Sequence, residues 1–198
     1  MTIHGHSQSK TLQPAIFLDR DGTINVEKNY LHRFEDWEWI PGAQAAIKMF
    51  KKSGYRVVVV SNQAGIARGM FEASDVDRLH SFVQQELACL GTTIDAFYYC
   101  PHHPDINGNC SCRKPAPGML VQASLDLNLD LARSWMIGDK LIDVWAGQAA
   151  GVKSMMVRTG YGVGEQKNID RAIRVFDSVF HAAEFIATIE QCQKTSHV

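Results

Sequence analysis

Residues 55–60 read Tyr-Arg-Val-Val-Val-Val, and this run decides the fold class. Four consecutive valines leave no polar face. The segment is therefore predicted to be a strand that is buried on both sides, as strands are in a parallel sheet. Shorter apolar runs predict further strands at 15–18, 94–99, 134–137 and 153–157.

Helical patterns lie between these runs. Ala43, Ala46, Ile47 and Phe50 recur at helical spacing after Pro41-Gly42, and Gly54 stops the pattern. Further helices are predicted over 74–90 with Ser74 as N-cap, and over 117–127, 141–150 and 179–189. The alternation predicts an α/β fold, a doubly wound, Rossmann-like parallel sheet with helices on both faces and no separate cap domain. Ligands would lie at the carboxyl ends of the strands.

The composition is that of a globular protein with one domain. The chain has 198 residues and a formal net charge of -1, which gives no electrostatic reason to expect a nucleic acid or a membrane as partner. No apolar run approaches the roughly 20 residues that span a bilayer. We expect a tail over 1–13 that is disordered, a single domain over 14–198, a cytoplasmic location and a monomer.

Two carboxylates follow the first predicted strand, at Asp19 and Asp21. Charges this close together favour a hard divalent cation such as Mg²⁺. Asp19 could attack phosphorus as a nucleophile, and Asp21 could act as the general acid and base. Taken alone, the pair is a weak signal and favours the simpler interpretation, two aspartates that cap a loop.

Polar residues follow two other segments. Ser61 and Asn62 end the valine strand and could donate hydrogen bonds to a phosphate, although such residues are also common in turns. Lys114 could neutralise a phosphoryl group, and Arg113 could bind a second anionic group; a surface pair of charges is the alternative.

The predicted strand at 134–137 also ends in acidic residues. Asp139 would complete the Mg²⁺ site, and Asp143 could orient its neighbours or cap the following helix. The order Asp pair, Ser, Lys, Asp along the chain predicts that all of them converge at one edge of the sheet.

The irregular segment 100–117 contains a possible metal site. Cys100, His102, Cys110 and Cys112 offer three thiolates and one imidazole, a complete tetrahedral set for structural Zn²⁺. His103 is a competing ligand, and disulfides are the alternative. Cys89 and Cys192 are expected to be ordinary buried thiols.

These motifs resemble those of the haloacid dehalogenase superfamily of phosphotransferases, with matches at Asp19 and Asp21, Ser61, Lys114, and Asp139 with Asp143. Within it, the chain is similar to the family of D-glycero-D-manno-heptose-1,7-bisphosphate 7-phosphatases. The stretches that carry this likeness lie between about 15 and 160 and read FLDRDGTIN, VVVVSNQAGIARG, YYCPHHP and CSCRKPAPGML.

The resemblance implies a hydrolase that releases the 7-phosphate of this sugar bisphosphate, a small phosphorylated molecule, and leaves a heptose 1-phosphate for surface glycan synthesis. It implies Mg²⁺ on Asp19, Asp139 and the backbone carbonyl of Asp21, and Zn²⁺ on the four residues of segment 100–117. The implied substrate-binding residues are Glu27, Lys28, Asn29, Tyr30, Asn62, Gln63, Ala64, Arg113 and Lys140.

Two features leave alternatives open. The segment between His102 and Cys110 is shorter than in some members of the family, which puts the exact sugar in question. Histidinol-phosphate phosphatases carry a similar zinc loop and are the nearest rival, whereas the stretch around 28–42 favours the heptose branch. A zinc-containing module that binds phosphosugars without turnover is the alternative from another class.

Overall fold

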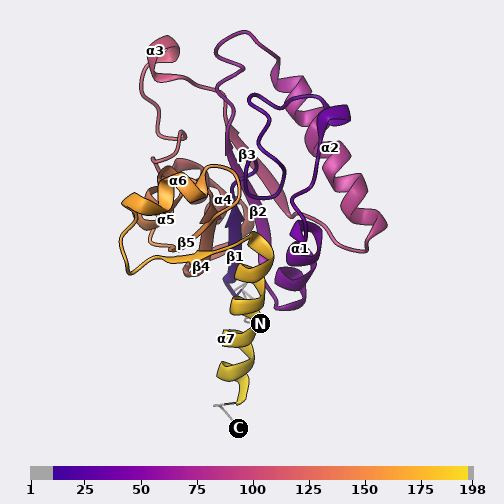
Figure 1. Cartoon of the computed structure of the whole chain (residues 1–198), viewed down its shortest axis with the longest axis vertical. Helices are drawn as coiled ribbons and strands as arrows, with labels where there is room; N and C mark the ends of the chain where they lie inside the picture. The colour runs from indigo at the N-terminus through magenta and orange to yellow at the C-terminus, as the bar shows by residue number, and fades with distance from the viewer. Residues whose placement is uncertain (1–10, 196–198) are drawn as a thin grey trace, which may run out of the picture.

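The structure is a computed structural model that describes residues 11–195, and its centre is a parallel sheet of six strands (Figure 1). The strand order is β3-β2-β1-β4-β5-β6. The strands are β1 (Gln13–Leu18), β2 (Arg56–Asn62), β3 (Ala96–Cys100), β4 (Leu129–Gly138), β5 (Lys153–Val157) and β6 (Arg174–Phe176). This confirms the predicted fold class.

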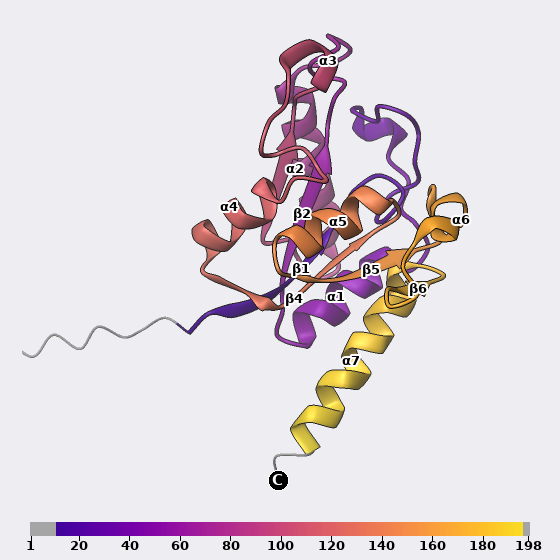
Figure 2. The same ribbon diagram turned by 90° about the vertical axis from the view of Figure 1, so that its left-hand side faces the viewer.

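Helices cover both faces of the sheet (Figure 2). The main helices are α1 (Ala43–Lys52), α2 (Ala73–Cys89), α4 (Gly118–Leu127), α5 (Leu141–Ala149) and α7 (Val179–Thr195). Residues of α1, α2 and α7 form one hydrophobic cluster with the sheet, and residues of α4 and α5 form the other. Within residues 11–195, no helix has the length and apolar character needed to cross a membrane.

The valine run explains how one strand joins both layers. Val57 and Val59 pack in the cluster with α1 and α7, whereas Val58 and Val60 pack in the cluster with α4. Side chains alternate along a strand, so only a strand that is apolar at every position can serve both faces. All four valines are fully buried.

β4 is longer than the predicted strand over 134–137. Its first half pairs with Gln13 and Pro14 of β1, and the register then shifts before Ile16. The Ser134 hydroxyl accepts a hydrogen bond from the Ala15 backbone N–H at 2.8 Å and lies at this irregularity. The polar residues of the first half hid the strand, because a bulged segment need not follow the apolar pattern.

The start of α2 corrects one prediction. The N-cap is Glu72 and not Ser74, and the Asp75 carboxylate accepts a hydrogen bond from the Glu72 backbone N–H at 2.8 Å. This is the reciprocal half of a capping box, in which the third helical residue reaches back to the cap.

Short elements that the sequence pattern did not predict complete the chain. They are η1 (Phe34–Asp36), α3 (Pro104–Asn107), α6 (Gly162–Glu165), η2 (Gln166–Asn168) and β6. Because β1 begins at Gln13, the last residue of the expected tail 1–13 is part of the sheet. Residues 1–10 of that range lie outside the described part of the chain.

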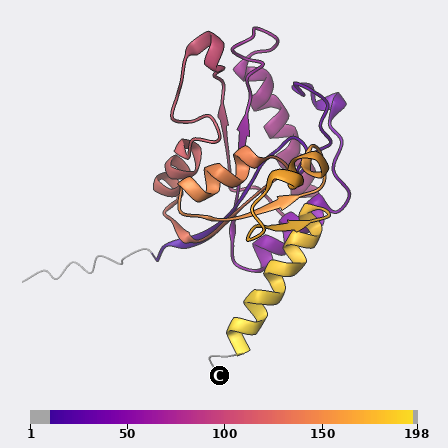
Figure 3. The same cartoon turned by 60° about the vertical axis from the view of Figure 1, so that its left-hand side comes forward.

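The topology brings three strand ends together. The neighbours β2, β1 and β4 are parallel, so their carboxyl ends meet at one edge of the sheet. From β1 the strand order runs through β2 to β3 on one side, and from β4 through β5 to β6 on the other, so the topological switch point lies between β1 and β4. The loop that leaves β3 carries α3 beyond this edge, whereas α7 runs out at the opposite end of the molecule (Figures 1 and 3).

The buried side chain of His80 is expected to make the folding stability of the protein fall at acidic pH. His80 in α2 is only 6% exposed, stacks on Phe97 with ring centroids 4.3 Å apart, and has no hydrogen-bond partner for Nε2 among the described residues. Burial, with a further contribution from the Arg20 charge, lowers the pKa of His80 to about 3.

We therefore predict that His80→Phe reduces acid sensitivity. Below pH 6.5 the unfolded state binds a proton that the folded state takes up only near pH 3. The free energy of unfolding of the wild type should then fall more steeply than that of the variant, by up to about 1.4 kcal/mol per pH unit. Urea unfolding between about pH 6 and about pH 4 measures this difference, and parallel curves would contradict it.

Candidate active site

A buried lysine between two aspartates forms the centre of the site. Asp19 is the first residue after β1, and its backbone N–H donates to Ile137 of the neighbouring β4 at 2.9 Å. The Lys114 Nζ lies 2.6 Å from a carboxylate oxygen of Asp19 and 2.6 Å from one of Asp143. It also donates to the Val60 carbonyl at 2.8 Å. These contacts tie the ends of β1 and β2 to the start of α5.

Three carboxylates cluster at the site, and the lysine forms ion pairs with only two of them. Oxygens of Asp19, Asp139 and Asp143 all lie within 4.8 Å of one another, and all three residues are buried. Burial, together with the Asp19 and Asp143 charges, raises the pKa of Asp139 to about 8. Burial also raises the pKa of Asp19 to about 6, although the Lys114 charge opposes this. A site with this excess of buried negative charge needs a further cation.

Asp139 has one oxygen that is free to bind such a cation. Its Oδ2 accepts a hydrogen bond from the Tyr161 backbone N–H at 2.8 Å, whereas its buried Oδ1 has no hydrogen-bond partner among the described residues. The backbone of two glycines lies against Oδ2: a Cβ added at Gly22 or Gly160 would lie 2.3 or 2.2 Å from it. Buried carboxylates and an unpaired oxygen fit Mg²⁺, which prefers oxygen ligands.

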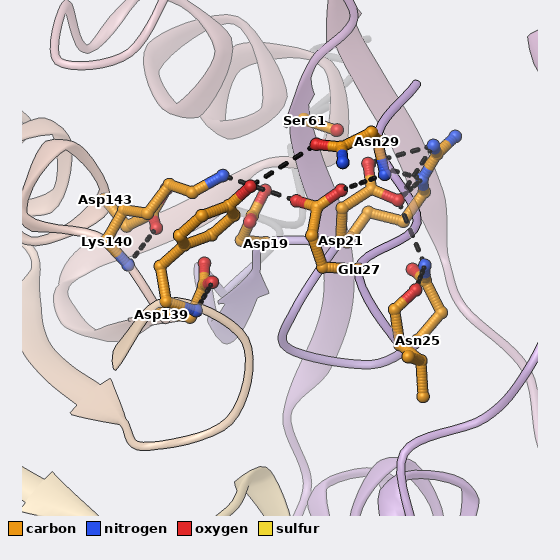
Figure 4. Close-up of polar contacts among 12 residues, drawn as sticks. Asp19, Asp21, Asn25, Glu27, Asn29, Ser61, Asp139, Lys140 and Asp143 are labelled. Carbon is orange, nitrogen blue, oxygen red and sulfur yellow. Dashed lines mark hydrogen bonds and ion pairs between the residues drawn. The ribbon is translucent and has the colours of Figure 1, made fainter. Parts of the chain in front are cut away.

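Asp21 points into a separate network. Its carboxylate forms an ion pair with Arg20 at 2.9 Å and accepts hydrogen bonds from the Asn25 and Gln63 side chains, each at 3.0 Å (Figure 4). Burial alone would raise its pKa, but the Arg20 charge and these hydrogen bonds hold the pKa of Asp21 below its usual value. Asp21 is therefore an ionised carboxylate in this arrangement, and its side chain is not part of the cluster around Asp139.

The end of β2 connects this network to the lysine. Gln63 Nε2 donates to the buried Ser61 hydroxyl at 2.7 Å as well as to Asp21. The Asn62 side chain donates to the Lys114 carbonyl and accepts from the Lys114 N–H, both at 3.0 Å. Asn62 therefore fixes the backbone that carries the lysine.

A cavity of about 260 Å³ opens above these groups. Most of the predicted site residues line it, namely Asp19, Asp21, Glu27, Asn29, Tyr30, Ser61, Asn62, Gln63, Ala64, Arg113, Lys114 and Lys140. Asp139 lies beneath the cavity and is not part of its lining. Of the predicted substrate-binding residues, Lys28 is not in the lining, and its Nζ lies 3.0 Å from Glu38. The expectation that Lys28 binds the substrate stays a prediction.

The sequence reasoning did not select three residues that line the cavity: His103, Ile142 and Tyr161. His103 was considered only as a metal ligand. Tyr161 follows the end of the predicted strand at 153–157, so the rule that ligands bind at carboxyl ends of strands could have identified it.

The four candidate metal ligands of segment 100–117 also come together. The Cys112 sulfur lies 3.1 Å from that of Cys100 and 3.4 Å from that of Cys110, and 3.3 Å from His102 Nδ1. His103 is directed away, with Nε2 2.8 Å from an Arg68 nitrogen. The ligand set Cys100, His102, Cys110 and Cys112 could therefore hold one metal ion.

The cluster of Cys100, His102, Cys110 and Cys112 also affects the position of Arg113. Arg113 donates to the His102 carbonyl at 3.1 Å, so the cluster fixes a cation at the rim of the cavity.

Cys89 and Cys192 are exposed, and the expectation that they are buried was wrong. Both lie on helices whose buried face is formed by other residues, such as Leu87 in α2 and Ile186 in α7.

Comparison with known proteins agrees with this geometry. A family model described as HAD-hydrolase-like matches residues 111–182. The chain is 46% identical over 153 residues to the D-glycero-beta-D-manno-heptose-1,7-bisphosphate 7-phosphatase of Yersinia pestis, covering 74% of this chain and 81% of the relative. The phosphatase of the same name from Escherichia coli K12 is 47% identical, with 74% and 80% covered. The chain belongs to this phosphatase family.

The fold also matches a solved structure of a phosphatase from this family. The D,D-heptose 1,7-bisphosphate phosphatase of B. bronchiseptica, solved with magnesium and phosphate, superposes with a TM-score of 0.82 at 32% identity. The match covers 88% of this chain and 98% of that one. The family resemblance and the fold without a cap domain are thereby confirmed. Phosphatases of the haloacid dehalogenase (HAD) superfamily use Mg²⁺ as a class.

Proposed function

We propose that this chain is a magnesium-dependent phosphatase that removes the 7-phosphate of D-glycero-D-manno-heptose 1,7-bisphosphate through an aspartyl phosphate on Asp19. The observation that carries the proposal is Lys114, which is buried between Asp19 and Asp143 and lines the cavity, while these two carboxylates cluster with Asp139. The substrate named for the relatives supports the sugar and favours its beta anomer.

Asp19, Asp139 and the backbone carbonyl of Asp21 would hold the Mg²⁺. When bound, the ion would neutralise the carboxylates and draw the negative phosphate toward them. Lys114 supplies a fixed positive charge 2.6 Å from an Asp19 oxygen, and this charge costs no rearrangement during the reaction. Burial alone would lower the pKa of Lys114, but the charges and hydrogen bonds of Asp143 and Asp19 outweigh it and raise this pKa above its usual value, so the side chain stays charged.

The chain's own residues carry two displacements. An Asp19 oxygen bonds to phosphorus as the bond to the sugar oxygen breaks, and Asp21 gives that oxygen a proton. Water then attacks the phosphorus, Asp21 takes its proton, and the bond to Asp19 breaks. Asp21 suits the second step as it stands, because it is ionised. For the first step, the negative substrate must raise its pKa by proximity.

The rest of the cavity would position the sugar. Ser61 and the backbone of the β2 loop can donate to the transferring phosphate, with Asn62, Gln63 and Ala64 around them. Glu27, Asn29 and Tyr30 would contact the hydroxyl groups. Arg113 and Lys140 are the cations left for the second phosphate.

We also propose that the thiol cluster binds structural Zn²⁺, because three thiolates and one imidazole are a closed tetrahedral set for this ion. Cys112→Ala should lower the zinc content from about one ion per chain to near zero and lower the thermal midpoint. Activity should fall as well, since the cluster anchors Arg113 through His102. Metal analysis and calorimetry measure these changes.

Cys89→Ala is the matched control, because this thiol is exposed and lies outside the cluster. It should leave metal content, thermal midpoint and activity unchanged. Zinc that persists at full stoichiometry in Cys112→Ala would contradict the assignment.

A panel of phosphomonoesters tests the function. It contains both anomers of heptose 1,7-bisphosphate, histidinol phosphate, fructose 1,6-bisphosphate and an aryl phosphate, each with and without Mg²⁺. We expect the highest kcat/KM for a heptose bisphosphate, and loss of turnover on chelation. Preference for histidinol phosphate would overturn the substrate, and release from none would favour a binding module. A cytoplasmic location and a monomeric state stay predictions.

A further inference from the structure

Tyr161 has a place in the site that the chemistry above does not use. It follows β5, lines the cavity, and is 45% exposed. Its backbone N–H binds Asp139, so the chain path at this point is fixed independently of the side chain. The ring is therefore free to serve a second purpose.

The Tyr161 side chain closes a ring of four residues around one side of the cavity. The Lys140 Nζ lies 4.2 Å from the centroid of the tyrosine ring and 3.5 Å from a Glu27 oxygen. The Asn29 backbone N–H donates to Glu27 at 2.8 Å, and the tyrosine hydroxyl lies 3.4 Å from the Asn29 side-chain oxygen. Figure 4 shows Lys140, Glu27 and Asn29 facing one another. Two loops far apart in sequence are thus joined.

Tyr161 and Glu27 also separate this cavity from a second one. A second cavity of about 490 Å³ lies beside the first and has an apolar lining that includes Val26, Ile40 and Pro41. Tyr161 and Glu27 line both cavities and so form the wall between them. Without the aromatic ring, the sugar side of the site would open into this apolar hollow.

The position of the Lys140 side chain depends on the aromatic ring, because three nearby carboxylates also attract its ammonium group. Asp19, Asp139 and Asp143 lie near its charge and would draw a flexible ammonium toward the metal-binding carboxylates. An aromatic face attracts a cation and limits the positions that its long side chain can take. The ring thus favours the position in which the ammonium borders the cavity beside Glu27.

We propose that Tyr161 is a positioning residue that sets substrate specificity: its aromatic side chain holds Lys140 where the ammonium can bind the second anionic group of a sugar. This rests on the proposed function. The residue acts through Lys140 and does not touch the reacting phosphate. The ring carries most of the effect, because 3.4 Å is long for a hydrogen bond between two oxygens.

The experiment compares heptose 1,7-bisphosphate with heptose 7-phosphate, which differ only in the second phosphate. We expect Tyr161→Leu to raise KM for the bisphosphate about tenfold at unchanged kcat, and to leave both constants for the monophosphate unchanged. Tyr161→Phe, which keeps the ring, should stay within about threefold of the wild type. In a Lys140→Met background, Tyr161→Leu should have no further effect on the ratio of the two KM values.

Lys153→Met is the matched control, because Lys153 also lies over an aromatic ring, that of Trp135 at 5.0 Å, but at the opposite end of β5. It should change neither substrate. Equal losses on both substrates, a loss confined to kcat, or no change in Tyr161→Leu would overturn the proposal. If the wild type does not hydrolyse the bisphosphate, the proposed function fails first and the specificity role falls with it.

Discussion

Asp19→Asn should abolish phosphate release while the protein stays folded. The amide cannot form the acyl phosphate, so we expect kcat to fall by at least about 10⁴-fold on every substrate. Two effects on stability oppose each other. The variant loses the ion pair with Lys114 but also loses a charge that repels Asp139. The thermal midpoint should therefore shift by no more than about 4 °C, which steady-state kinetics and calorimetry measure together.

Asp177→Asn is the control for this substitution. Asp177 makes an ion pair with Arg158 but is 71% exposed at its side chain and lies outside the cavity. Its loss should leave both kcat and the midpoint unchanged. Full activity in a folded Asp19→Asn variant would exclude Asp19 as the nucleophile.

Lys114→Met should have the largest effect on stability. The Lys114 side chain is 1% exposed and its ammonium compensates two buried carboxylates, so its removal leaves Asp19 and Asp143 unpaired. Breaking a buried ion pair in this way typically costs about 3–5 kcal/mol, and loss of the fixed charge should lower kcat by about 10³-fold. The loss of stability should be greater at pH 8 than at pH 5.5, because unpaired carboxylates can be protonated in acid.

Lys51→Met serves as the comparison. Lys51 also lies 2.6 Å from a carboxylate, that of Asp95, but it is 25% exposed and Arg56 binds the same carboxylate. We expect a loss of less than about 1 kcal/mol. Urea unfolding at the two pH values measures both variants. Equal losses in the two variants would contradict a special role for the buried lysine.

The sequence predicted those features that depend on local pattern. The valines of β2 had to be buried on both faces, and Asp19, Ser61 and Asp139 had to lie at one edge because each lies at the carboxyl end of a strand of one parallel sheet. Lys114 was selected by its chemistry, and the structure places it between Asp19 and Asp143.

Features that depend on tertiary contacts were missed. The first half of β4 is held by a bulge at Ser134, which leaves no apolar period to detect. The Tyr161 contact with Lys140 exists only because the loop after β5 folds back over Asp139. Lys28 is adjacent to residues of the cavity, but a single step along the chain turns its side chain toward Glu38.

Trapping the intermediate tests the central claim most directly. Wild-type protein would be mixed with heptose 1,7-bisphosphate and Mg²⁺, quenched in acid within the first turnover, and digested for peptide mass spectrometry. We predict phosphate on the peptide that contains Asp19, with heptose 1-phosphate as the product. Phosphate on another residue, or product formed with no phosphorylated protein at any time, would contradict the mechanism.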